Sequence, residues 1–172
     1  MKNCKCNKMI TEIKGDITNI ECDYICQQNN CIAVKSHGLS ETIEKKLKAC
    51  PYSRRTPVPG KNLAIPEHRP KLGQILTIQS PVKNVKVVCM FAQFSYGKVG
   101  SFYYYARDET KESRADAFQK CLNKMNKRIP SEKVVAFPKY IGCGLAGGDW
   151  NVYYKMIENF SKDRNVLIVN YN

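Results

Sequence analysis

The segment from residue 140 to residue 150 has the residue types of an anion-binding turn. An apolar run leads into closely spaced glycines, and a helix start follows them directly. Glycine lets the backbone approach a ligand closely, and N–H groups beside a helix N-terminus form a natural cradle for phosphate. A tight turn without a ligand is the alternative interpretation. The glycines are Gly142, Gly144, Gly147 and Gly148.

Two well-known nucleotide-binding patterns are missing from this segment. It matches neither GxxxxGK[ST], the loop of many ATPases, nor GxGxxG, the loop of Rossmann dinucleotide-binding domains. The lysine and the hydroxyl residue that the first pattern needs for phosphate and magnesium are absent. The sequence therefore argues against ATP hydrolysis and against dinucleotide binding of the Rossmann type.

A second candidate is Asp16, which follows the first strand-like run in the sequence Gly15-Asp16-Ile17-Thr18. A carboxylate accepts hydrogen bonds, and a buried one at this position would suit the exocyclic amine of a nucleobase. The alternative interpretation is a turn in which the aspartate caps the next segment.

The groups available for acid–base chemistry are Lys35 and His37, which lie in one polar loop. Histidine titrates near neutrality, and lysine stabilises charge on a leaving group or forms an imine with an opened ribose. Lys98 is a further candidate. Asp149 either takes part in chemistry from a helix start or only caps that helix. For the two lysines and His37, a solvated surface position is the alternative. Cys143 is a possible nucleophile because a helix N-terminus lowers a thiol pKa.

The 172 residues include 28 Lys and Arg against 15 Asp and Glu, which gives a formal charge of +13. This balance favours polyanionic partners such as nucleic acid or nucleotides. The lysines are spread along the chain, so a well-solvated cationic surface is an equally good interpretation. An RNA-binding protein that stacks bases on Tyr103, Tyr104 and Tyr105 is the alternative from a different class.

Nine cysteines form an odd number, and no secretory signal accompanies them, so we expect reduced thiols. No CxxC pair occurs, and we expect no metal, although clustered cysteines make a zinc site the alternative. No apolar run reaches the length of a membrane span. We therefore expect an intracellular monomer, cytoplasmic or nuclear, without a membrane partner. The clustered cysteines are Cys4, Cys6, Cys22, Cys26 and Cys31.

The elements that must position these residues alternate between strands and helices along the chain. This alternation predicts an α/β fold, a three-layer α/β/α sandwich with a mixed, largely parallel sheet. The length predicts one domain over residues 1–172, with residues 1–7 as a flexible N-terminus. We expect strands at 8–13, 24–28, 73–79, 85–92, 134–138 and 165–171, and helices at 40–50, 109–127 and 149–160.

Two details of these elements matter for the fold. The run at 85–92 is nearly continuous in apolar residues, as expected of a strand covered on both faces. Ser40 is the predicted cap of the first helix and Pro51 its predicted end. Residues 51–72 contain five prolines and are predicted to form a long ordered loop.

The sequence resembles the macro domain family in the order of four motifs, each of which lies after or within a predicted strand. The motifs are GDIT, QQNNC, FAQF and YIGCGLAGGDW. The resemblance covers residues 8–171. It is most specific at Ile141 to Leu145 with Asp149 and Trp150, which look like the second phosphate loop of a particular branch. That branch contains terminal ADP-ribose protein glycohydrolases and ADP-ribose 1″-phosphate phosphatases.

The resemblance implies an ADP-ribose site that needs no metal and no cofactor. Asp16 would bind the adenine amino group, with a backbone contact from Ile17, and Tyr171 would pack on the adenine. The loop after the second strand would meet the distal ribose, and the glycine loop would surround the diphosphate. The ribose loop contains Asn29, Asn30, Cys31, Gly38 and Leu39, and the diphosphate loop contains Gly142, Cys143, Gly144, Leu145 and Ala146.

Two departures from the family pattern bear on activity. The ribose loop lacks the glycine run of many hydrolytic macro domains, and Ala146 stands where the glycohydrolase branch has an aspartate. The resemblance therefore implies either a hydrolase or a reader without chemistry. The hydrolase would use Asp149, Lys35 and His37, and it would remove ADP-ribose from protein or nucleic acid or dephosphorylate ADP-ribose 1″-phosphate.

Overall fold

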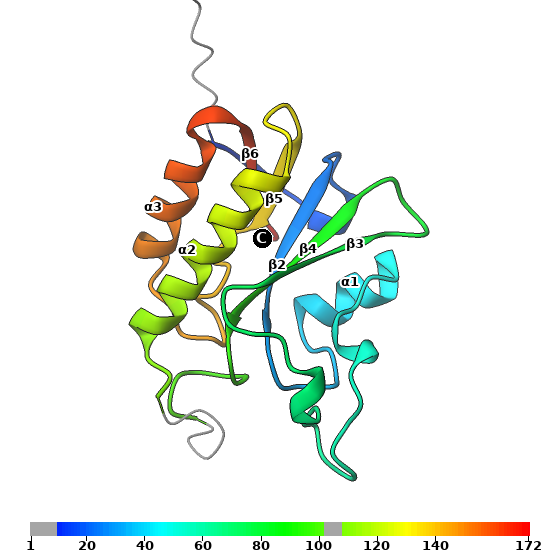
Figure 1. Cartoon of the computed structure of the whole chain (residues 1–172). Coiled ribbons are helices and arrows are strands. Elements are labelled where there is room, and N and C mark those ends of the chain that lie inside the picture. Colours follow the sequence, from blue (N-terminus) through cyan, green and yellow to red (C-terminus); the bar gives the residue numbers. More distant parts are fainter. Residues whose placement is uncertain (1–9, 102–107) are drawn as a thin grey trace, which may run out of the picture.

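The computed structural model describes residues 10–101 and 108–172 (Figure 1). Within them six strands form one sheet in the order β1-β6-β5-β2-β4-β3. Neighbouring strands are parallel except for β3 and β4, which are antiparallel. The predicted mixed, largely parallel sheet is confirmed. The strands are β1 (Ile10–Lys14), β2 (Tyr24–Asn30), β3 (Ile75–Gln79), β4 (Lys86–Gln93), β5 (Val134–Pro138) and β6 (Asn165–Asn170).

Helices cover both faces of this sheet, as the sequence predicts. Figure 1 shows α2 (Lys111–Arg128) and α3 (Trp150–Phe160) together on one face and α1 (Leu39–Leu47) on the other. Each face has its own apolar core, one formed with α2 and α3 and one formed with α1. The molecule is therefore a three-layer α/β/α sandwich.

The central strand β4 shows how the sequence specifies these two cores. Val88 and Met90 belong to the core beneath α2 and α3, whereas Val87 and Cys89 belong to the core beneath α1. Successive side chains of a strand point to opposite faces, so a strand covered on both sides is apolar at every position. The prediction of a doubly covered strand is confirmed.

The first helix begins and ends differently from the prediction. Its N-cap is Gly38, at φ 59° and ψ −127°, a conformation open to glycine and strained for other residues. Ser40 lies inside the helix, where its hydroxyl donates to the His37 carbonyl at 2.8 Å. The helix ends when Lys48 takes a left-handed conformation, so Pro51 does not terminate it. The predicted cap and the predicted end were both wrong because backbone geometry, which the sequence shows only indirectly, determines both.

Residues 51–72 form an ordered loop, as predicted. The loop contains two short 3-10 turns, Tyr52–Arg54 and Pro66–His68, and one isolated bridge between Pro57 and Ala64. Tyr52 and Arg55 are buried and connect this loop to the end of β2. Two further 3-10 turns, Ile17–Asn19 and Ser161–Asp163, follow β1 and α3.

The cysteines within the described ranges are free thiols, and most are buried. Cys26 lies in the core beneath α2 and α3, while Cys31 lies in the core beneath α1. Because these two thiols are on opposite faces of the sheet, they cannot share a zinc ion with Cys22. In the part of the chain that the structure describes, no helix combines the length and apolar character of a membrane span. The predicted flexible residues 1–7, Cys4, Cys6 and the tyrosines at 103–105 lie outside the described residues.

Replacing Phe118 by alanine should lower the free energy of unfolding by about 3–5 kcal/mol. Phe118 is fully buried in α2, and its ring centroid lies 4.7 Å from that of Tyr153 in α3. Chemical denaturation monitored by circular dichroism measures the change. Val152→Ala, at a position 44% exposed on α3, is the control and should change stability by less than about 0.5 kcal/mol. Equal losses in both variants would contradict the assigned core.

Candidate functional site

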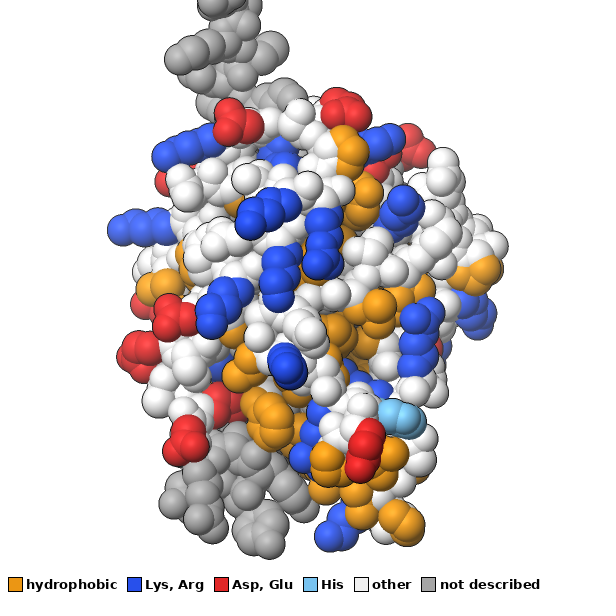
Figure 2. Space-filling view, viewed as in Figure 1, with side chains coloured by type: hydrophobic (Ala, Val, Ile, Leu, Met, Phe, Trp, Pro, Cys, Tyr) orange, Lys and Arg blue, Asp and Glu red, His pale blue; other side chains and the backbone are white. Residues whose placement is uncertain are grey.

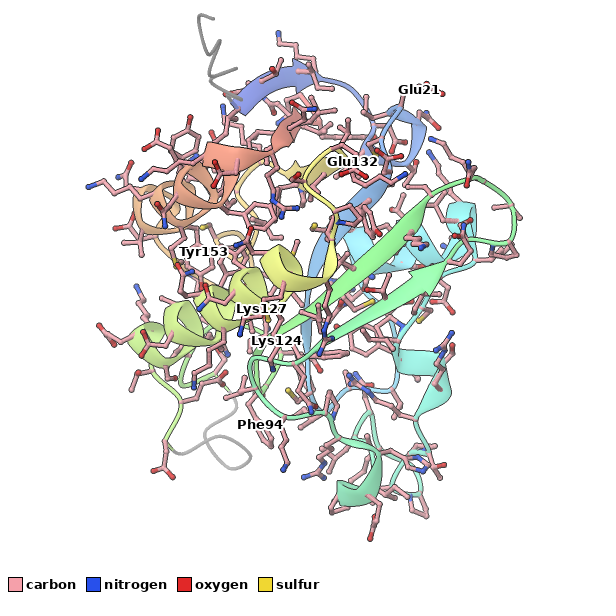
Figure 3. All side chains as sticks on the ribbon, turned by 45° about the horizontal axis from the view of Figure 1, so that its top comes forward. Glu21, Phe94, Lys124, Lys127, Glu132 and Tyr153 are labelled. Atoms are coloured by element: carbon pink, nitrogen blue, oxygen red, sulfur yellow. The ribbon has the colours of Figure 1, made fainter. Side chains whose placement is uncertain are left out.

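A cleft of about 1150 Å³ opens at the carboxyl ends of the parallel strands. Its lining comes mainly from residues 15–17, 35–40, 138–146 and 169–172, which follow β1, β2, β5 and β6. Ligands of open α/β sheets bind at this edge, where the loops after the strands converge. Figure 3 labels Glu21 and Glu132, which precede β2 and β5 and so mark the opposite edge.

The turn between β5 and α3 presents free backbone donors to this cleft. The N–H groups of residues 141, 143, 147 and 148 donate to carbonyls of the same segment at 2.8–3.1 Å. Those of Gly142, Gly144, Leu145 and Ala146 have no acceptor within residues 10–101 and 108–172, and all four residues line the cleft. Backbone donors are almost always paired in proteins, so these four are available to an anionic ligand.

Glycine is required at the start of this turn. Gly142 has φ 74°, and a Cβ atom there would lie 2.6 Å from Cε1 of Tyr153 and 2.7 Å from Oε1 of Gln28. A Cβ atom on Gly148 would lie 2.6 Å from the Gly142 carbonyl oxygen. The turn is therefore packed directly against β2 and α3, which fixes the position of its N–H groups.

A buried arginine holds the same turn from the side of α2. Arg114 is 2% exposed, and all five of its N–H groups are used. Two donate to the Glu109 carboxylate at 2.8 and 3.0 Å, and one reaches the Ala146 carbonyl at 3.1 Å. The remaining two donate to the carbonyls of Ser95 and Gly97. Arg114 thus joins α2, the loop after β4 and the donor turn.

Asp16 lies at the other end of the cleft with both carboxylate oxygens engaged. Oδ1 accepts from the N–H and the hydroxyl of Thr18 at 2.9 and 2.6 Å, and Oδ2 pairs with the Lys46 ammonium at 2.5 Å. The pKa of Asp16 is lowered to about 2, mainly by the hydrogen bond from the Lys46 ammonium and to a smaller extent by the hydrogen bonds from Thr18. The Gly15 N–H donates to the Asn170 carbonyl at 3.0 Å, which brings the next residues of the two segments, Asp16 and Tyr171, to the same end of the cleft. Both residues line the cleft.

The end of β2 contributes buried amides, of which only some reach the cleft. Asn30 lines it, and its Oδ1 accepts from the N–H groups of Ile32 and Ala33. Asn29 is 1% exposed, does not line the cleft and donates to the Tyr52 hydroxyl at 3.1 Å. Cys31 is fully buried in the core beneath α1. Of the three predicted ribose contacts in this stretch, only Asn30 therefore lies on the cleft surface.

The loop from residue 33 to residue 39 forms the cleft rim beside α1. Lys35 and His37 are exposed and line the cleft together with Gly38 and Leu39. Asn62 holds this loop, because its Oδ1 accepts from the N–H groups of Val34 and Lys35 at 2.9 and 3.1 Å. The structure thus brings both candidate acid–base groups and the α1 N-terminus to one rim.

The fold is shared with solved structures of other proteins. No family profile and no curated protein matches the sequence. A protein of unknown function from Bacteroides thetaiotaomicron is similar in structure, with TM-score 0.67 and 24% identity over 94% of this chain and 97% of its own. The macrodomain of Mycobacterium tuberculosis DarG gives 0.62 and 16% over 95% and 98%. The chain has the macrodomain fold.

A further neighbour with this fold was solved with a ligand. The Trypanosoma brucei macrodomain in complex with ADP-ribose has TM-score 0.61 and 11% identity, covering 95% of this chain and 64% of that chain. At these identities the likeness establishes the macrodomain fold alone.

Within the macrodomain fold, Asp149 occupies a structural position. Its carboxylate accepts from the Asn151 N–H at 2.9 Å as the N-cap of α3, and Asp149 is not among the residues that line the cleft. The structure therefore favours the capping interpretation and separates Asp149 from Lys35 and His37. Burial, and then the charge of Asp149, raise the pKa of Cys143 to about 11, opposite to the lowering that a nucleophile needs.

Several residues that shape the site were not identified from the sequence. Gln28 donates to Oε1 of Gln93 at 2.8 Å, and its own Oε1 is buried beside Gly142 without a partner among the described residues. Gln27 also lines the cleft, and its buried Oε1 likewise has no partner in the described ranges. The detectable signal was the abrupt change in β2 from apolar residues to consecutive amides. For Arg114 the signal was a charge in helical register with the apolar face of α2.

Exchanging Gly142 for alanine should destabilise the protein by about 1–3 kcal/mol, because the new Cβ atom collides with Tyr153 and Gln28 at a positive φ. Thermal and chemical unfolding measure this change. Gly144→Ala is the matched control in the same turn, since a Cβ atom there meets nothing within 4 Å. If both variants are equally stable, the close packing of the turn is refuted.

Alkylation of Cys143 by iodoacetamide should be slow near neutral pH and rise about tenfold per pH unit from about pH 7 to pH 10. The reason is the raised pKa of about 11, which keeps the thiol protonated. Peptide mapping by mass spectrometry assigns the modified cysteine at each pH. A rate that levels off near pH 8.5, the ordinary value for a thiol, would contradict the expected environment.

Proposed function

We propose that the cleft binds ADP-ribose. The observation that carries this proposal is the presence, in one cleft, of four free N–H groups in the turn 142–146 and the Asp16 carboxylate. The first suits a diphosphate and the second suits an adenine amine. The ligand of the Trypanosoma brucei macrodomain, which shares the fold, supports the same choice.

In this proposal the adenine lies at the β1–β6 end of the cleft. Asp16 accepts a hydrogen bond from the exocyclic amine, and the exposed ring of Tyr171 packs on the base. The carboxylate keeps its bonds to Thr18 and Lys46, because each carboxylate oxygen accepts more than one hydrogen bond. Lys46 then acts as a positioning residue that keeps Asp16 ionised.

The diphosphate lies between the donor turn and the N-terminus of α1. The turn supplies its free N–H groups. The positive end of the α1 helix dipole, at Gly38 and Leu39, adds to the attraction. The distal ribose then extends toward Asn30, Lys35 and His37, which line the same rim. Buried amide oxygens on Gln27 and Gln28 are acceptors available to the ligand's hydroxyl groups or to water.

The finer proposal is that the cleft is hydrolytic and releases ADP-ribose from a modified protein or nucleic acid, or phosphate from ADP-ribose 1″-phosphate. Support comes from Lys35 and His37, which stand exposed at the ribose end where a leaving group would depart. The structural role of Asp149 and the presence of Ala146 support the alternative, a reader that binds without turnover.

Asp16→Ala should weaken ADP-ribose binding about 10- to 100-fold, the usual loss when a charged hydrogen-bond partner is removed. Isothermal titration calorimetry measures the affinity. Glu132→Ala removes an exposed carboxylate at the opposite edge of the sheet and should leave binding unchanged. If the wild-type protein gives no heat with ADP-ribose, or if both variants bind equally well, the proposed adenine contact is wrong.

The same titration has a defined pH dependence. The pKa of Asp16 lies below its ordinary value, so the carboxylate stays ionised and its contribution to affinity is constant between about pH 5 and pH 8. The contribution is lost only as the pH falls toward about 2. A step in affinity above pH 5 that Asp16→Ala abolishes would contradict this environment.

Turnover should be tested on ADP-ribosylated protein, ADP-ribosylated nucleic acid and ADP-ribose 1″-phosphate side by side, with product analysis for each. Lys35→Ala and His37→Ala should reduce turnover at least about tenfold while calorimetric ADP-ribose binding persists. Asp149→Asn keeps a good helix cap and removes the acid, so it should keep turnover if Asp149 only caps. Binding without any product in the wild-type protein would select the reader.

A further inference from the structure

A second cavity, of about 480 Å³, lies between residues 51–70, the start of β3 and the C-terminal half of α2. We refer to it as the basic pocket. Five cationic side chains and His68 line it, and Glu67 is the only carboxylate among its lining residues. The cations are Arg54, Arg55, Arg69, Lys124 and Arg128.

Arg55 is the most unusual of these groups because it is 8% exposed and has no carboxylate partner among the described residues. Two of its N–H groups donate to the carbonyls of Ala33 and Asn30 at 2.8 and 2.9 Å, and the other three have no protein acceptor in the described ranges. Its guanidinium lies 4.9 Å from the Tyr52 ring centroid. A desolvated cation with spare donors favours an anion beside it.

The positive charge continues from the basic pocket along α2. Lys120, Lys124, Lys127 and Arg128 are spaced at four, seven and eight residues, so they share one side of the helix. We refer to these four as the α2 stripe. Figure 2 shows Lys and Arg side chains gathered over α2, and Figure 3 shows Lys124 and Lys127 next to each other on the side toward β3. Lys124 donates to the Gly73 carbonyl at 2.8 Å, and no member of the stripe forms an ion pair with any described residue.

We propose that the basic pocket binds a phosphate of a single-stranded nucleic acid whose backbone continues along the α2 stripe. Several arginines converge on one cavity, and the guanidinium group matches phosphate oxygens in a bidentate manner. A free phosphate would leave Lys120 and Lys127, the stripe residues outside the pocket, without an anionic partner. A chain of phosphates engages both the pocket and the stripe.

The apolar part of the pocket supports a nucleic acid over other polyanions. Pro70, Ile75 and Leu76 line it beside the arginines and offer contact to a base or a sugar. An acidic peptide or an inorganic polyphosphate would make no comparable use of this surface. The site is separate from the ADP-ribose cleft, so the inference does not depend on the proposed function.

Binding should be measured by fluorescence anisotropy of a labelled mixed-sequence DNA strand of about 15 nucleotides across salt concentrations of about 50–200 mM. The test variant is Arg54→Ala with Arg128→Ala, since both side chains are exposed and neither forms a hydrogen bond or an ion pair with a described residue. It should weaken binding about tenfold and reduce the salt slope by about 1.4, because each lost phosphate contact on a single strand accounts for about 0.7.

The matched control is Lys155→Ala with Lys162→Ala, which removes the same charge from exposed positions on α3 and the turn after it. It should keep the affinity and the salt slope of the wild-type protein. Equal weakening in both double variants would overturn the proposal, because binding would then follow net charge alone. Failure of the wild-type protein to bind the strand would overturn it as well.

Competitors identify the chemistry of the occupant. Poly-glutamate should displace the strand far less effectively than an unlabelled DNA or RNA strand at equal charge, and equal displacement would overturn the proposal. Pyrophosphate bound in an Arg54-dependent manner without any strand binding would also overturn it.

A cross-check separates this site from the ADP-ribose cleft. Asp16→Ala should bind the strand normally, and the Arg54/Arg128 variant should bind ADP-ribose normally. Strand binding that depends on Arg54 and Arg128 in a protein without ADP-ribose affinity would refute only the proposed function. ADP-ribose binding without strand binding would refute only this inference.

Discussion

The buried ion pair between Arg114 and Glu109 is the interaction on which the cleft most depends. Glu109 also accepts from the N–H group of Phe94 at 2.6 Å, so the pair joins the start of α2 to the loop after β4. The third partner is the Ala146 carbonyl in the donor turn. A buried pair of this kind contributes little net stability but fixes geometry, since removing one partner leaves the other charged and desolvated. The free N–H groups of the turn are held in place by a residue that does not itself line the cleft.

The end of β2 shows a second constraint, which is that a binding edge must place polar groups where a core would otherwise continue. Gln27, Gln28 and Asn29 each keep a buried amide oxygen without a partner in the described structure. Such atoms carry a desolvation cost and are usually paired in native proteins. Gln27 and Gln28 line the cleft, where water or a bound ligand would relieve this cost. Arg164, after α3, is another described residue with buried polar atoms that lack a partner in the described structure.

The sequence predicted the layers of the fold and the position of the cleft because both depend on local patterns. Continuous apolar residues identified β4, and glycines before a capped helix identified the donor turn. The cap at Gly38 was missed, because its unusual ψ is set by the path of the preceding loop. Arg114 and Arg55 were missed for a more general reason. Their partners are carbonyls from distant segments, and a carbonyl has no residue identity that a sequence pattern can reveal.

The strand order has a consequence for the way this chain acquires its structure. Among the described strands β1 pairs only with β6, so β1 has no neighbour in this sheet until β6 has been synthesised. During translation, residues 10–14 must remain unpaired in this sheet while β2, β4 and β5 assemble, and contacts between segments far apart in the sequence are slow to form. The end of the cleft that contains Asp16 and Tyr171 is thus completed only after β6 has been made. Ligand affinity at that end would report that β1 and β6 have paired.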